Sequence, residues 1–185
     1  MANLNGLKVA ILVDGFEQVE LVEPRKALDQ AGAETKIVSP KNDRFAVGSL
    51  RTGATSCQWT CLSIKTEPEN FDALLLPGGV INPDKLRIEP KAVKFVKSFF
   101  TAGKPVAAIC HGPWTIIEAD EARGRRIASW PSLKTDLRNA GAEWMDQESV
   151  VDRNLVSSRK LEDIPAFNRA MIDAFSGSRA KARHA

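Results

Sequence analysis

A cysteine directly follows an apolar run in VAAICHGP, residues 106 to 113. Cys110 and His111 end that run abruptly, and a segment with helical spacing comes next. A thiol at such a strand-to-helix turn stands clear of the backbone at the positive end of the helix, which favours the reactive thiolate. A buried core cysteine is the alternative, because free cysteine is among the most buried residue types. Two other motifs of the chain favour the reactive thiol.

The first of these motifs is a glycine pair in Pro77-Gly78-Gly79, which ends the apolar run FDALLL (71 to 76). Glycine lets the backbone approach a ligand closely, so the N–H of Gly79 can act as an oxyanion donor beside the thiol. The amide of His111 can supply a second donor, as the residue after the nucleophile does at comparable turns. A plain turn is the alternative interpretation of the pair.

The second motif is acidic, because Glu17, Glu20 and Glu23 recur every three residues. A solvated helix start, favoured by the helix dipole, explains most such runs. If this helix begins at the carboxyl end of a strand, however, one carboxyl points towards the edge where Cys110 lies. Burial and like charge would keep that carboxyl protonated, and it would donate a hydrogen bond to the thiolate.

Apolar runs that alternate with helical segments predict the elements that position these residues. This alternation is typical of βαβ units and predicts one α/β domain with a largely parallel sheet covered on both faces. Ligands bind such sheets at the carboxyl ends of the strands. The expected strands are 7–13, 34–39, 71–76, 104–109, 125–130, 148–152 and 154–158, and one or two hairpins are expected within 42–65. The expected helices are 16–31, 89–101, 113–119, 132–140 and 161–175. Pro24 predicts a kink in the first helix or a late start near that residue.

In this arrangement three loops meet at one edge of the sheet. They are Asp14 to Glu20, Pro77 to Asp84 and Cys110 to Pro113. All the residues that could take part in a reaction lie on these loops. Their convergence at one edge indicates a functional site.

Composition narrows the class of protein. The length of 185 residues fits one domain, expected at 1–176, with a basic and poorly ordered tail at 177–185. A net charge of +3, spread along the chain, predicts no nucleic-acid partner. Three cysteines and two histidines predict neither a disulfide framework nor a metal site, and no cofactor is expected. The sequence begins without a signal-peptide pattern and contains no membrane-length apolar run, so a cytoplasmic location is expected.

Four segments together resemble the ThiJ/PfpI superfamily. Within it the chain is similar to the protease I or general stress protein branch, relatives of the parkinsonism-associated deglycase. The similarity leaves only about the last ten residues unmatched, and it implies a flavodoxin-like three-layer α/β sandwich that forms a homodimer or a larger ring. The segments are GFEQVELVEP (15 to 24), FDALLLPGG (71 to 79), GKPVAAICHGP (103 to 113) and NAGAEWMDQESVVDRNLVSSRKLEDIPAFNRAM (139 to 171).

The resemblance also implies roles for particular residues. Cys110 matches the nucleophile and redox-sensitive thiol of the family, and Glu20 matches the carboxyl that bonds this thiol, with Glu17 a second acid nearby. Gly79 and His111 match the amides near the oxyanion position. In the protease I branch the histidine is thought to pair with an acid from a neighbouring subunit, and Asp84 occupies that place here.

Two departures from the family pattern bear on mechanism. Trp130 stands where several relatives have a tyrosine near the thiol, and this chain has no tyrosine at all, so a phenolic proton donor is absent. Asp84 is one methylene shorter than the glutamate of some relatives. The relay from cysteine through histidine to this acid is therefore expected to be weaker or differently arranged.

Three functions are compatible with these motifs and residues. The first is a glyoxalase- or deglycase-type hydrolase, in which the thiolate attacks a dicarbonyl or a glycated group. The second is a cysteine peptidase, disfavoured because a histidine adjacent to the cysteine rarely turns its ring to the sulfur. The third is a stress protein whose thiol senses oxidants or whose surface acts as a chaperone. Glutamine amidotransferases are excluded because no histidine lies between His111 and His184, and dinucleotide binding has no glycine motif to support it.

Overall fold

A computed structural model describes residues 3–14, 18–40, 61–63 and 67–182 of the chain. Its centre is a seven-stranded sheet with the order β3-β2-β1-β4-β5-β9-β8, in which β8 alone runs antiparallel to its neighbour. The inner order β2-β1-β4-β5-β9 is the flavodoxin-like arrangement. The strands are β1 (Lys8–Leu12), β2 (Glu34–Ser39), β3 (Cys61–Ser63), β4 (Ala73–Leu76), β5 (Val106–Ile109), β8 (Val150–Asp152) and β9 (Leu155–Ser158).

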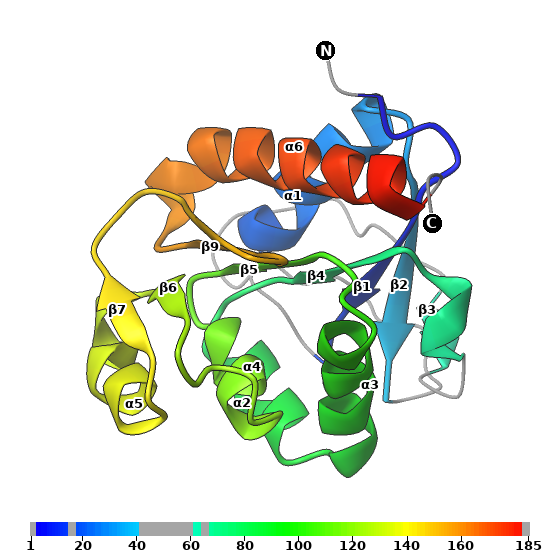
Figure 1. Ribbon diagram of the computed structural model, residues 1–185. Helices are drawn as coiled ribbons and strands as arrows, with labels where there is room; N and C mark the ends of the chain where they lie inside the picture. Colours follow the sequence, from blue (N-terminus) through cyan, green and yellow to red (C-terminus); the bar gives the residue numbers. More distant parts are fainter. Residues whose placement is uncertain (1–2, 15–17, 41–60, 64–66, 183–185) are drawn as a thin grey trace, which may run out of the picture.

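Helices cover both faces of this sheet, which confirms the expected sandwich (Figure 1). One layer holds α1 (Gln18–Gln30) and α6 (Ile164–Ala182), and the other holds α2 (Ile81–Arg87), α3 (Pro90–Thr101) and α4 (Pro113–Glu118). A two-stranded parallel sheet lies beside the main one. It consists of β6 (Arg126–Ala128) and β7 (Glu143–Met145), and α5 (Lys134–Asn139) packs against it.

The strands separate two apolar cores, one under each helix layer. Phe95 and Phe99 of α3 pack in the first core, and Phe167 of α6 with Leu28 of α1 packs in the second. Because β1, β4 and β5 contribute buried residues to both clusters, these strands are apolar on both faces, as their sequences predict.

Several elements differ from the sequence expectation. Helix α2 lies where a loop was expected, and β7 was not expected at all. Helix α1 (Gln18–Gln30) includes Pro24 and does not begin near it, and α6 continues to Ala182 instead of ending near residue 175. Of the segment expected to form hairpins, the structure describes only 61–63, and that strand pairs in parallel with β2.

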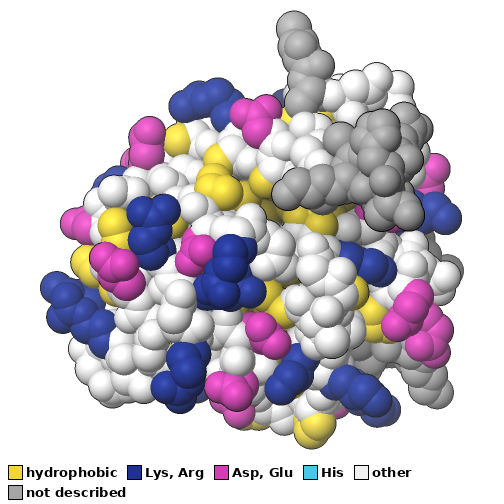
Figure 2. Space-filling view, in the orientation of Figure 1, with side chains coloured by type: hydrophobic (Ala, Val, Ile, Leu, Met, Phe, Trp, Pro, Cys, Tyr) yellow, Lys and Arg dark blue, Asp and Glu magenta, His cyan; other side chains and the backbone are white. Residues whose placement is uncertain are grey.

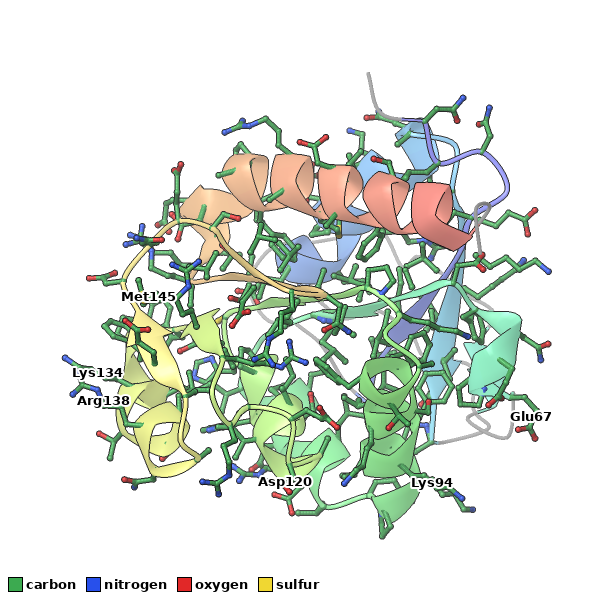
Figure 3. The ribbon with its side chains drawn as sticks, in the orientation of Figure 1. Glu67, Lys94, Asp120, Lys134, Arg138 and Met145 are labelled. Atoms are coloured by element: carbon green, nitrogen blue, oxygen red, sulfur yellow. The ribbon has the colours of Figure 1, made fainter. Side chains whose placement is uncertain are left out.

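The outer surface mixes charges of both signs. Lys, Arg, Asp and Glu side chains are interspersed over the face shown in Figure 2. Lys134 and Arg138 of α5 extend from the outer side of the molecule, and Lys94 and Asp120 lie at the end opposite α6 (Figure 3). Within the described ranges, no helix combines the length and apolar character needed to cross a membrane.

The strand order brings the three candidate loops together. β1 pairs with β4 and β4 pairs with β5, all in parallel, so their carboxyl ends lie next to one another at one edge. Asp14 follows β1, the Gly78-Gly79 pair follows β4, and Cys110 follows β5 directly. The convergence expected from the sequence is therefore present in the fold.

Candidate active site

Cys110 occupies a strained turn between β5 and α4. Its φ angle is 61°, in the left-handed region that non-glycine residues rarely adopt. Main-chain hydrogen bonds hold the turn on both sides of the cysteine peptide: the Cys110 amide donates to the Ser158 carbonyl at 3.1 Å, and the Trp130 amide donates to the Cys110 carbonyl at 2.9 Å. The residue is only 6% exposed. This is the geometry of a nucleophile elbow, with a buried rather than a projecting thiol.

The imidazole of His111 turns back onto this thiol. Its Nδ1 lies 3.2 Å from Cys110 Sγ, although the two residues are adjacent in sequence. The expectation that an adjacent histidine does not face the sulfur is therefore wrong. The left-handed turn at Cys110 explains the contact, because it redirects the chain between the two side chains.

The outer nitrogen of the same ring has a partner within the chain. Ser132 Oγ lies 3.3 Å from His111 Nε2. If Nε2–H donates to this hydroxyl, Nδ1 is left with its lone pair directed at the thiol. Because a hydroxyl can accept as well as donate, Ser132 is compatible with the tautomer in which His111 can accept the proton of Cys110.

Two indole rings enclose His111. Trp130 stacks on it with ring centroids 6.2 Å apart, and Trp114 meets it edge-on at 5.1 Å. Trp114 is itself fixed, because its Nε1 donates to Asp136 Oδ2 at 2.8 Å and the Arg87 guanidinium lies 5.4 Å from its ring centre. Trp130 is 41% exposed and so forms the solvent side of the site.

Glu20 lies on the other side of the thiol, 3% exposed, on the first turn of α1. The Gly79 amide donates to its Oε2 at 2.6 Å. Gly78 packs so closely that a Cβ there would contact the Glu20 carboxyl and lie 2.6 Å from Cys110 Cβ. Glycine at 78 is therefore required by the approach of these two side chains, and Gly79 adopts a φ of 70°.

Opposing effects act on the Cys110 thiol. Burial raises its pKa well above the ordinary range, and the charge of Glu20 and its hydrogen bond raise it further. Hydrogen bonds from the Gly79 and His111 amides lower it. The helix dipole was expected to favour the thiolate. Burial and Glu20 outweigh this effect, because both raise the pKa of the thiol. Burial also lowers the pKa of His111, which keeps its imidazole neutral and able to accept a proton.

Cys110 and Glu20 share one buried space, so they titrate as a pair in which one negative charge is far easier to place than two. We expect the rate of Cys110 alkylation in the unaltered protein to rise with pH in two steps. In Glu20→Gln it should rise in one step, at a lower pH than the upper wild-type step, because the carboxylate that raises the thiol pKa is gone. Alkylation by iodoacetamide, followed on the Cys110 peptide by mass spectrometry, measures both profiles. Glu162→Gln, at an exposed carboxyl, is the control, and two steps in Glu20→Gln would contradict the pairing.

The structure brings together most of the residues singled out in the sequence: Cys110, His111, Glu20, Gly79 and Trp130. Asp84 lies apart from them within the chain, exposed on α2, and Glu17 lies outside the described residues. Within the described part of the chain, no three histidine, cysteine or acidic side chains gather as a metal site.

Sequence reasoning missed three contributors. Ser132 gave no signal because its contact with His111 spans 21 positions. Trp114 resembled any apolar residue at the start of a helix. Gly78 was visible as half of a glycine pair, and only the approach of Glu20 distinguishes it from Gly79.

Comparison with known proteins places this site in a family. The DJ-1/PfpI family model matches residues 7–174. A deglycase of Pyrococcus horikoshii is 43% identical over 169 residues, covering 90% of this chain and 98% of the relative. General stress protein 18 of Bacillus subtilis is 40% identical over 169 residues, covering 90% and 96%. Protein/nucleic acid deglycase 2 of Escherichia coli is 42% identical over 167 residues, covering 89% and 95%.

Solved structures show the same fold. A two-domain protein of Anabaena variabilis, with DJ-1/ThiJ/PfpI-like and ferritin-like domains, aligns with a TM-score of 0.82 at 36% identity, over 90% of this chain and 47% of that one. DJ-1β of Drosophila melanogaster aligns with a TM-score of 0.80 at 24% identity, over 92% and 91%. With the family model matching nearly its whole length, the chain belongs to the DJ-1/PfpI family.

Proposed function

We propose that this protein is a stress-response hydrolase that uses Cys110 to convert dicarbonyls, or their adducts on amines and thiols, into hydroxy acids. The observation that carries the proposal is the contact of 3.2 Å between Cys110 Sγ and His111 Nδ1, beside the buried Glu20. Relatives named deglycases, at 40 to 43% identity, support the substrate class. The reaction needs a reduced thiol, which suits the cytoplasmic location expected from the sequence.

The first step is attack of sulfur on the aldehyde carbon. In an adduct, the bond from this carbon to the amine or thiol breaks first: the adduct's hydroxyl proton passes to the leaving group, and the carbon becomes an aldehyde. Cys110 passes its proton to His111 Nδ1, the S–C bond forms, and the carbonyl oxygen takes up a proton to give a hemithioacetal. The Gly79 amide, which donates to Glu20 Oε2 before the attack, and the His111 amide both act on the sulfur, and we assign to them the stabilisation of the developing oxyanion.

The second step needs no external oxidant. A proton leaves the carbon that bears sulfur and another is added to the neighbouring carbon, so the first carbon is oxidised to a thioester while the second is reduced to an alcohol. Glu20 or His111 carries these protons. Water then breaks the S–C bond and frees the thiol. One glyoxal and one water yield one glycolate, methylglyoxal yields lactate, and an adduct also releases its amine or thiol.

The direct test measures glycolate and lactate by mass spectrometry after incubation with glyoxal, methylglyoxal, or arginine and cysteine derivatives modified by them. Protein alkylated at Cys110 is the control. We expect one hydroxy acid for each dicarbonyl consumed, and only with the free thiol. Equal product from free and alkylated protein would overturn the proposal.

Peptide hydrolysis is the second candidate, and one observation favours it. The contact between His111 Nδ1 and Cys110 Sγ supplies the thiol–imidazole pair that a cysteine peptidase needs. Cleavage of unmodified casein by highly purified protein, with a loss of that cleavage after Cys110 alkylation, would identify a peptidase. Hydroxy-acid release without casein cleavage identifies the dicarbonyl hydrolase.

The active form is a homo-oligomer, a dimer or a larger ring, in which Asp84 of one chain reaches His111 of another. Support comes from Asp84 being exposed on α2 and from Val80, Ile81 and Ile88 leaving large apolar side chains exposed around the same helix. An added carboxylate would stabilise the imidazolium that Ser132, a neutral group, cannot.

Asp84→Asn is therefore expected to lower kcat/KM about tenfold, because the imidazolium formed during attack loses its ionic partner. Asp120→Asn, at an exposed aspartate beyond α4 (Figure 3), should leave kcat/KM unchanged. Steady-state assays of both variants, with light scattering to give the oligomeric state, make the comparison. If Asp84→Asn keeps full activity in an intact oligomer, Asp84 is not the ionic partner of the His111 ring.

A further inference from the structure

Asn82 is a fully buried polar side chain that the mechanism above does not use. It lies in the first turn of α2 and is 1% exposed. Its Oδ1 accepts the Asp14 amide at 2.8 Å, and its Nδ2 donates to the Pro77 carbonyl at 3.0 Å. Both partners are main-chain groups beyond strand ends: Pro77 directly follows β4, and Asp14 lies two residues after β1.

The two segments that Asn82 joins lead directly into the site. Pro77 is followed by Gly78, which packs on Cys110 and Glu20, and by Gly79, whose amide donates to Glu20 Oε2. Asp14 precedes the segment that enters α1, where Glu20 lies on the first turn. Asn82 thus ties the strand end that presents the amide to the strand end that presents the carboxyl.

A side-chain amide suits this position because it donates and accepts at once. A carboxylate cannot donate to Pro77, and an aliphatic side chain of similar size would leave a buried N–H and a buried C=O without their partner. The position of Gly79 relative to Glu20 is consequently fixed by a third residue and not by their mutual hydrogen bond alone.

We propose that Asn82 is a positioning residue for the thiol site, holding the Gly79 amide and the Glu20 carboxyl in register at the Cys110 sulfur. The inference rests on Cys110 being the reacting group of the proposed function. Glu20 and His111 are the titratable groups beside this sulfur, and the side-chain hydrogen bonds of Asn82 go to the main chain of Asp14 and Pro77. Its effect travels through the backbone at Asp14 and Pro77.

The test is the pH profile of Cys110 alkylation by iodoacetamide, which needs no substrate. In Asn82→Ala the Pro77 carbonyl loses its anchor, so the Gly79 amide two residues further on is displaced while Glu20 stays on α1. The amide that lowers the thiol pKa is then lost and the carboxyl that raises it remains, so the pKa rises and alkylation at neutral pH slows about tenfold. Asn154→Ala is the matched control, because Asn154 Nδ2 donates to the Lys104 carbonyl at 2.8 Å near the opposite end of β5 and β9. This control should destabilise the fold in urea while leaving the alkylation profile unchanged.

Asn82→Ser keeps a hydroxyl that can hydrogen-bond to one of the two partners. This variant tests the positioning role of Asn82 if Asn82→Ala does not fold. A slowing between those of the unaltered protein and Asn82→Ala, or about threefold where only the serine variant folds, supports the proposal. Folded Asn82 variants with the same profile as Asn154→Ala would overturn it. If the Asn82 variants change the alkylation profile but the unaltered protein turns over no dicarbonyl, the proposed function is rejected. The positioning role of Asn82 is then still supported.

Discussion

Replacing Cys110 by serine is expected to lower kcat/KM for methylglyoxal by about 10⁴-fold or more. Serine is nearly isosteric, so the left-handed turn and its main-chain bonds to Ser158 and Trp130 should remain. A hydroxyl beside a buried carboxyl, however, has no accessible alkoxide, and neutral His111 is a weak base for it. The loss should therefore fall on the chemical step and leave the free energy of unfolding little changed.

Lactate formation under steady-state conditions measures this effect, and urea unfolding shows whether the variant is intact. Cys61→Ser, at another cysteine of the chain, should keep full activity. A Cys110→Ser protein that retains more than about 1% of the activity would remove the covalent mechanism.

The second large effect is expected for Gly78→Ala. A Cβ at this position would lie 2.6 Å from Cys110 Cβ and 2.7 Å from the Ile109 carbonyl, and it would also meet the Glu20 carboxyl. The thiol and the carboxyl must separate to make room. We expect kcat/KM to fall about 100-fold and the free energy of unfolding to fall by about 1–3 kcal/mol.

Gly103→Ala separates crowding from backbone strain. Gly103 has a φ of 64°, but a Cβ there would meet nothing within 4 Å. Its replacement should cost about 1 kcal/mol of stability with no change in kcat/KM. Urea unfolding and the lactate assay are applied to both variants. If Gly78→Ala loses only as much activity as Gly103→Ala, the close approach at 78 has no bearing on the reaction.

The sequence predicted the central strands and the convergence of three loops, because these depend on local signals. Apolar runs such as 71–76, stopped by glycine or by Cys110, indicate buried parallel strands regardless of what surrounds them. Once β1, β4 and β5 are recognised as parallel neighbours, their ends must meet, and Cys110, Glu20 and Gly79 come together without further information.

The elements that were missed depend on context. Helix α2 is seven residues long and contains Pro83, which is tolerated in a first turn but reads as a loop signal in the sequence. The three-residue strand β7 is too short for any periodicity. Likewise, the protonation of Cys110 depends on burial and on the charge of Glu20, neither of which is visible in VAAICHGP.

The indoles on either side of His111 give the site an optical signal. The chain has four tryptophans and no tyrosine, so its near-ultraviolet emission comes from indole alone. Trp114 and Trp130 are in ring contact with His111, and an imidazolium withdraws an electron from an excited indole where a neutral imidazole does not. Emission therefore falls as this one ring gains a proton, and the ionisation of His111 can be followed in solution without a label.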